Sequence, residues 1–128
     1  MAKTATKKPL MAMSLLDVEV KRAAISTASN VAAGVAIVPA VAGKKICLLS
    51  MFLMAAGAVT VTVFSGAANA QAPKPRSGAV ALAANGGFVI PAPANPEHHW
   101  IETDAGEPLT ILLSAEVQVS GFITYYEF

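Results

Sequence analysis

The residues that could take part in metal or acid–base chemistry are few, and most of them lie between positions 98 and 107. His98 and His99 are adjacent. Adjacent side chains of an extended strand point to opposite faces, so these two rings could not bind one ion together. Asp104 and Glu107 flank Gly106, but a calcium site needs more oxygen ligands at a recognisable spacing. We therefore predict that both acids belong to a turn and that the sequence holds no metal site.

The sequence gives no support for nucleophilic catalysis either. Cys47 is the one cysteine of the chain, which rules out an intramolecular disulfide. It lies in an apolar run, where a buried and unreactive thiol is the ordinary state. No motif pairs a serine or threonine with a histidine and an acid, and no helix follows the glycine-rich turn 85–87 to bind a phosphate. We expect no catalytic residue, no cofactor and no enzymatic activity.

The segment 44–72, KKICLLSMFLMAAGAVTVTVFSGAANAQA, has the layout of a secretory signal peptide. A lysine pair precedes an uncharged run, and Ala-Asn-Ala precedes Gln71. Its position argues against export, because a signal peptide has its basic region at the extreme N-terminus. A membrane-spanning helix is a second alternative, since about 20 apolar residues span a bilayer.

The internal pattern of this segment favours strands over a helix. Val59, Val61 and Val63 alternate with Thr60 and Thr62, and β-branched residues favour extended backbone. Such alternation predicts that the valines face one layer and the threonines face the other way. We predict strands at 45–53 and 58–65, joined by a turn at 55–57 into a central hairpin.

Similar patterns predict an all-β domain over residues 15–128, preceded by a flexible basic arm at 1–14. Pro39 marks a strand end or a sheet edge, and the Pro-containing segment 66–78 is expected to be a surface loop. Short strands separated by turn signals every eight to twelve residues are typical of a sandwich or jelly roll. The fold expected is a jelly-roll-like antiparallel β-sandwich without a convincing helix. The other predicted strands are 17–25, the segment VAIVPAV within 31–41, 78–83, 88–90, 98–102, 109–113 and 116–128.

Composition and charge indicate a subunit that associates with other proteins. Only 13% of the residues are charged, which is low for a soluble monomer. Residues 1–45 carry seven basic groups and two acids, whereas residues 77–128 carry six acids and no lysine or arginine. This charge separation is explained either by ordinary solvated faces or by a basic N-terminal portion that meets an acidic partner or a second copy. The arm residues Lys3, Lys7, Lys8 and Leu10 are the expected partner-binding residues, and neither nucleic acid nor membrane is an expected partner.

Three strings of the chain resemble small virion structural proteins of tailed bacteriophages and prophages. They are VAGKKICLLSMFLMAAGAVTVTVFSG, GAVALAANGGFVIP and HHWIETDAGEPLTILLSAEVQVSGFITYY. The shared features are a Gly-Lys strand opening, an Ala-Gly-Ala turn into a Val/Thr strand, an Ala-Asn-Gly-Gly turn and a Thr-x-x-Gly-Glu-x-Leu turn. The resemblance covers roughly residues 31–126, and the longer loop NAQAPKPRSG departs from it.

This resemblance implies a β-sandwich that forms a homo-oligomer, most simply a trimer, on the surface of a capsid or as part of a tail. The expected role is a head decoration (cement) protein that binds major capsid subunits and stabilises the shell. The alternative is a receptor- or glycan-binding module of a tail fibre or baseplate, which would use loops 67–77 and 91–99 with Trp100 or the tyrosines against a sugar. Otherwise the aromatic residues are expected in the core or in subunit contacts: Trp100, Phe122, Tyr125, Tyr126 and Phe128.

Overall fold

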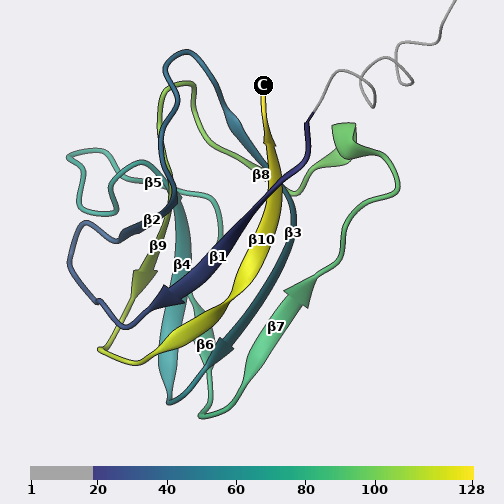
Figure 1. The fold of residues 1–128 in the computed structure, drawn as a ribbon. Helices are drawn as coiled ribbons and strands as arrows, with labels where there is room; N and C mark the ends of the chain where they lie inside the picture. Colours follow the sequence, from purple (N-terminus) through teal and green to yellow (C-terminus); the bar gives the residue numbers. More distant parts are fainter. Residues whose placement is uncertain (1–18) are drawn as a thin grey trace, which may run out of the picture.

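The structure, a computed structural model, describes residues 19–128 and consists of two antiparallel β-sheets packed face to face (Figure 1). The predicted arm, with Lys3, Lys7, Lys8 and Leu10, lies outside the described residues. The first sheet, sheet A, contains β1 (Lys21–Thr27), β10 (Val119–Glu127), β3 (Ile46–Ala55), β7 (Gly87–Ile90) and β8 (Ile101–Glu102). The second, sheet B, contains β2 (Val35–Val38), β9 (Leu109–Leu113), β4 (Val59–Ser65), β5 (Lys74–Pro75) and β6 (Val80–Leu82). The predicted β-sandwich is therefore confirmed.

Successive strands alternate between the two sheets along most of the chain. Sheet A has the order β1-β10-β3-β7, with β8 also paired to β3, and sheet B has the order β2-β9-β4-β5, with β6 also paired to β4. Chain connections therefore run across the sandwich from one layer to the other. Each sheet has five strands, two of which lie one after the other along the same neighbour, so that four strands lie side by side. This arrangement is the jelly-roll topology that the turn spacing predicted.

The core lies between the sheets and is built mainly from the inward positions of the long strands. In β4, Val59, Val61 and Val63 are buried and the two threonines are half-buried, which confirms the predicted alternation. Strand β3 supplies several side chains that are fully buried, because it occupies the centre of sheet A between β10 and β7. Its fully buried members include Ile46, Leu48 and Leu53.

The prediction of a hairpin over 45–65 is wrong in its pairing, although both strands exist. Strand β3 pairs with β10, β7 and β8, whereas β4 pairs with β9, β5 and β6. The turn around Gly57 therefore carries the chain from sheet A to sheet B. Two strands with strongly apolar faces bury more surface by facing each other across the core than by lying edge to edge.

Two further boundaries differ from the predictions. The first described strand begins at Lys21, so that Val20, part of the predicted strand 17–25, precedes it and is exposed. The inward residues of β1 include Ala23 and Ile25, because this strand pairs in register with β10. The predicted strand 98–102 is only partly a strand, since Pro96–His98 forms the short 3-10 helix η1.

The alternative of a membrane-spanning helix finds no counterpart in residues 19–128, where no helix has the length and apolar character that a membrane span requires.

Other turn predictions are confirmed. Strand β2 ends at Val38, directly before Pro39. Asn85 has a positive φ of 63°, a conformation that asparagine tolerates better than most residues. The turn that contains Asn85 joins β6 of sheet B to β7 of sheet A. It is therefore another crossing between the layers.

Candidate functional site

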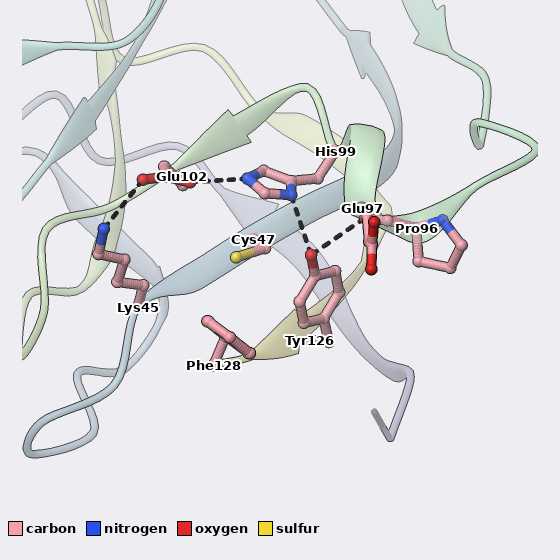
Figure 2. Close-up of a pocket in the computed structure, with 8 residues that line it drawn as sticks. All are labelled: Lys45, Cys47, Pro96, Glu97, His99, Glu102, Tyr126 and Phe128. Atoms are coloured by element: carbon pink, nitrogen blue, oxygen red, sulfur yellow. Dashed lines mark hydrogen bonds and ion pairs between the residues drawn. The ribbon is translucent and has the colours of Figure 1, made fainter. Parts of the chain in front are cut away.

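A cavity of about 270 Å³ lies on the outer face of sheet A, at the end where β3 begins (Figure 2). Cys47 is the central strand residue of this region, because it pairs with Tyr126 of β10 on one side and with Glu102 of β8 on the other. The segment between β7 and β8, which includes η1, adds the remaining wall. The lining residues are Lys45, Cys47, Pro96, Glu97, His99, Glu102, Tyr126 and Phe128.

An irregularity in β3 helps to place Cys47 on this outer face. The register between β10 and β3 shifts after Thr124, which pairs with Ser50, so that Tyr125 pairs with Leu48 and Leu49 is passed over. Bulges of this kind redirect side chains and are common next to functional sites. Here Cys47, Leu49 and Tyr126 form a small buried cluster separate from the main core.

Hydrogen bonds link the polar groups of the cavity into one chain (Figure 2). The His99 ring lies between two partners, with Nε2 2.8 Å from Glu102 Oε1 and Nδ1 2.9 Å from the Tyr126 hydroxyl. Tyr126 donates to the Pro96 carbonyl at 3.0 Å, and Lys45 donates to the second oxygen of Glu102 at 3.2 Å. The histidine is therefore held by contacts on both nitrogens.

The ionisation of these groups argues against a nucleophilic cysteine. Burial raises the pKa of the Cys47 thiol, whereas reactive cysteines have a lowered pKa. Burial also raises the pKa of Tyr126 to about 12. The pKa of Glu102 is lowered, first by its hydrogen bond to His99 and then by the bond from Lys45. The site therefore combines a neutral thiol with a carboxylate and an imidazole.

A second polar cluster holds the segment 66–77 against the turn that follows β8. Lys74 forms ion pairs with Asp104 at 2.9 Å and with Glu107 at 2.7 Å, and Arg76 pairs with Asp104 at 3.0 Å. The buried Ser65 hydroxyl donates to Glu107 at 2.6 Å and accepts the amide N–H of Asp104. The predicted loop 66–78 also contains the short strand β5, and these ion pairs hold it against the rest of the sandwich.

This cluster and two other contacts show how the separated charges of the sequence are used within the described residues. Lys21 pairs with Glu127 at 2.9 Å, and Lys45 pairs with Glu102 at 3.2 Å. Basic residues from the first part of the chain thus meet acids from the last part inside one subunit. Some of the basic residues near the start of the chain are therefore neutralised within the subunit and do not require an acidic partner.

We expect the Lys74 cluster to make stability depend on pH. The pKa of Glu107 is lowered, first by its hydrogen bond from Lys74, and that of Asp104 is lowered chiefly by the same lysine. A carboxylate with a lowered folded-state pKa adds stability above its unfolded pKa of about 4 and loses that stability as the pH falls through the folded value. Lys74→Met should therefore lower Tm by a few degrees at neutral pH, with a gap that closes at acid pH.

Thermal unfolding of wild type and Lys74→Met between neutral and strongly acid pH checks this prediction. Lys44→Met is the matched control, because Lys44 is exposed and is not in an ion pair within residues 19–128. A Tm difference for Lys74→Met that does not change with pH would contradict the assignment.

The middle of the outer face of sheet A is open and apolar, and it is bordered by polar residues, Arg22, Thr124 and Ser50 on one side and Ser26 and Ser120 on the other. In one row across the sheet, Phe122 of β10 pairs with Phe52 of β3, which in turn pairs with Val89 of β7. Val89 is 66% exposed, Met54 42% and Phe122 38%, and the two phenylalanine rings are 5.9 Å apart. Arg22 of β1 lies 5.2 Å from the Phe122 ring centre. We call this surface the apolar face; its members are Ala24, Phe52, Met54, Val89 and Phe122.

The two adjacent histidines have different surroundings in the structure, whereas the two acids of the following turn share one partner. His98 is exposed, while His99 reaches Glu102 and Tyr126. The two histidines were predicted to lie in a strand, but His98 belongs to η1 and His99 follows it. Asp104 and Glu107 do lie in the turn region before β9, as predicted, and both also bind Lys74.

The expectation that the aromatic residues lie in the core or in subunit contacts is confirmed for the two tyrosines, and for the exposed Trp100, Phe122 and Phe128 a subunit contact stays a prediction. Tyr125 and Tyr126 are buried, but Trp100 is 53% exposed and its indole N–H donates to the Pro91 carbonyl at 2.7 Å. Figure 1 places the teal segment between β4 and β5 on one side of the sandwich and the green segment between β7 and β8 on the other. The two loops considered for glycan binding extend in different directions, although Arg76 and His99 at their ends both contact Glu102.

Cys47, His99 and Glu102 form a group that was not predicted from the sequence. Each offers one metal-ligand atom, and these three atoms lie within 4.8 Å of one another. The available signal was the spacing His99-x-x-Glu102, which becomes informative only once β8 is known to pair with β3 at Cys47.

Comparison with models of known protein families, with curated proteins and with solved structures gave no match to this chain.

Proposed function

We propose that this chain is a non-enzymatic structural protein of a tailed-bacteriophage virion, a decoration (cement) protein that binds the major capsid protein at the capsid surface as a homo-oligomer, a trimer. The observation that carries the proposal is the apolar face. It spans four strands of sheet A, and its five members are all apolar, while Arg22 borders it over the Phe122 ring. A surface of this kind is typical of a subunit contact.

Two further features support the same function. The low charge content of the chain suits a protein that hides surface against neighbouring subunits. The jelly roll is an architecture used by viral capsid proteins, although lectins use it as well, so the fold alone does not distinguish the two functions. The resemblance of residues 31–126 to phage virion proteins supports a structural role in the virion, and the apolar face favours the capsid.

The main test is the oligomeric state of the protein with and without a charge in the apolar face. Sedimentation of the wild-type protein should show a small oligomer, and Val89→Glu should shift it to monomer, because a buried unpaired carboxylate is costly. Val31→Glu is the matched control, since Val31 is 53% exposed but lies outside the apolar face. A monomeric wild type, or equal effects of the two substitutions, would contradict the proposal.

Capsid binding distinguishes decoration from the alternative role. The protein should co-sediment with expanded capsids more strongly than with unexpanded ones, and Val89→Glu should weaken that binding if the oligomer is the form that docks. A tail-fibre or baseplate glycan-binding module is favoured by one observation, the exposed Trp100 ring. A protein that ignores capsids and binds glycans, with that binding lost in Trp100→Ala, would establish the alternative.

A further inference from the structure

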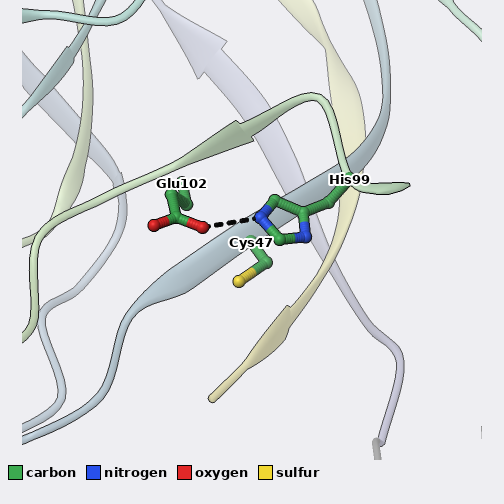
Figure 3. Close-up of side chains that lie close together, drawn as sticks. All are labelled: Cys47, His99 and Glu102. Atoms are coloured by element: carbon green, nitrogen blue, oxygen red, sulfur yellow. Dashed lines mark hydrogen bonds and ion pairs between the residues drawn. The ribbon is translucent and has the colours of Figure 1, made fainter. Parts of the chain in front are cut away.

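We infer that Cys47, His99 and Glu102 form a binding site for a zinc ion (Figure 3). The three side chains offer a sulfur, a nitrogen and an oxygen, and these atoms lie within 4.8 Å of one another. This combination of donors is one that zinc accepts. The inference does not depend on the proposed function, because the site lies beside the apolar face and uses none of its members.

The positions of the three donors follow from the sheet itself. Cys47 and Glu102 are paired residues on adjacent strands, so their side chains emerge on the same outer face. His99 precedes β8 and is brought over Cys47 by the chain reversal at η1. The main-chain N–H of Trp100 anchors this segment by donating to the Leu48 carbonyl at 3.0 Å. Two of the ligands are thus on strands, and the third follows a short turn that is bonded to β3.

The hydrogen bonds around His99 orient its ring as a metal ligand. The Tyr126 hydroxyl has one hydrogen, and the Pro96 carbonyl can only accept. The tyrosine oxygen therefore accepts from Nδ1–H of His99, which leaves Nε2 directed at Glu102 Oε1, 2.8 Å away. In the metal-free protein a proton between Nε2 and Glu102 Oε1 makes this hydrogen bond, and a zinc ion would take the place of that proton. A second partner that fixes the ring nitrogen opposite the metal is a regular feature of zinc sites.

The remaining ligands can close around the ion with small movements. Zinc–ligand bonds of about 2.0–2.3 Å place the donor atoms of a tetrahedral site about 3.5 Å apart. The Glu102 side chain is 45% exposed and can turn toward the ion, while its other oxygen keeps the bond from Lys45. Cys47 would bind as a thiolate, since the ion displaces the thiol proton. The adjoining cavity leaves a fourth position for water or a small ligand.

Cobalt is the most direct probe, because Co²⁺ accepts the ligands of zinc sites and absorbs light. The metal-free full-length protein should bind one Co²⁺ with d–d bands typical of tetrahedral coordination and a thiolate-to-cobalt charge-transfer band. Zinc should displace the cobalt and abolish both features. A wild-type protein that develops no such spectrum and shows no zinc binding by calorimetry would overturn the inference.

Three substitutions assign the ligands. Cys47→Ser should abolish the charge-transfer band. His99→Gln or Glu102→Gln should weaken zinc binding at least about a hundredfold, because loss of an outer-shell partner alone costs about 10–100-fold. His98→Gln is the matched control, since His98 is the adjacent histidine but is exposed and outside the cavity. Circular dichroism identifies variants that do not fold. Because Glu102 is partly exposed, we expect Glu102→Gln to fold. The site would be overturned if this variant bound zinc as tightly as wild type, or if His98→Gln weakened zinc binding to the same extent.

Discussion

Replacing Gly121 with alanine should lower the free energy of unfolding by about 3 kcal/mol, the upper part of the range for overpacked positions. Gly121 lies in β10, where it pairs with Leu53 of β3. A methyl group added at this position would overlap the main-chain carbonyl oxygen of Phe52. Because that obstacle belongs to the backbone of the central strand, it cannot rotate away as a flexible side chain would. The two strands would have to separate, and β10–β3 pairing would be lost around the substitution.

Urea denaturation of wild type and Gly121→Ala measures this effect. Gly78→Ala is the matched control, because an added methyl group there meets nothing within 4 Å and its stability should change by less than about 0.5 kcal/mol. Alanine can even stabilise such an open position by restricting the unfolded chain. Equal stability of the two variants would show that the strands tolerate a wider spacing at Gly121.

Thr103→Val should cost about 2 kcal/mol, because it leaves a buried amide without its hydrogen-bond acceptor. Thr103 is fully buried, and its hydroxyl oxygen accepts the N–H of Ile46 at 2.9 Å. Its own N–H donates to the Ile46 carbonyl at 3.0 Å. The residue therefore holds the end of β8 to the start of β3 with one main-chain and one side-chain bond. Valine has almost the same shape, so the loss isolates the hydroxyl group.

Thermal and urea unfolding of Thr103→Val should be compared with Thr62→Val, which changes a half-buried threonine on the outer side of β4. Stability of the control should change by no more than about 0.5 kcal/mol. If both substitutions have the same small effect, the Thr103 hydroxyl contributes nothing beyond packing. Since Thr103 follows Glu102, its variant should also loosen the zinc ligand set, which the cobalt spectrum can register.

Much of the fold was predictable because alternation of residue types is a local property of a strand. The Val/Thr pattern of 59–63 directly gives the buried and outward positions of β4. Alternation says which face a residue occupies, however, and says nothing of which strand lies beside it. For that reason the sequence predicted β3 and β4 correctly as strands and wrongly as a hairpin. In β1, the inward positions include the half-buried Lys21, which lacks the apolar character that the pattern requires.

The candidate sites were less predictable because they depend on strand register. Cys47 and Glu102 are 55 positions apart in the sequence, and only the pairing of β8 with β3 brings them together. The bulge that passes over Leu49 also has no clear sequence signal. The apolar face is similarly hidden, since its members come from strands that are distant in sequence and meet only through the order of sheet A.

The alternation of strands between the two sheets has a consequence for how the chain folds. Apart from β4 with β5 and β6, strands that pair in this sandwich are far apart in the sequence, and β1 pairs with β10 from Lys21–Tyr125 to Thr27–Val119. Proteins dominated by such distant contacts fold slowly, in milliseconds to seconds. During synthesis β1 has no sheet partner until β10 has left the ribosome. Until then β1 is unpaired, and β3 can pair on one side only, with β7 and β8, so both strands keep open edges that favour aggregation.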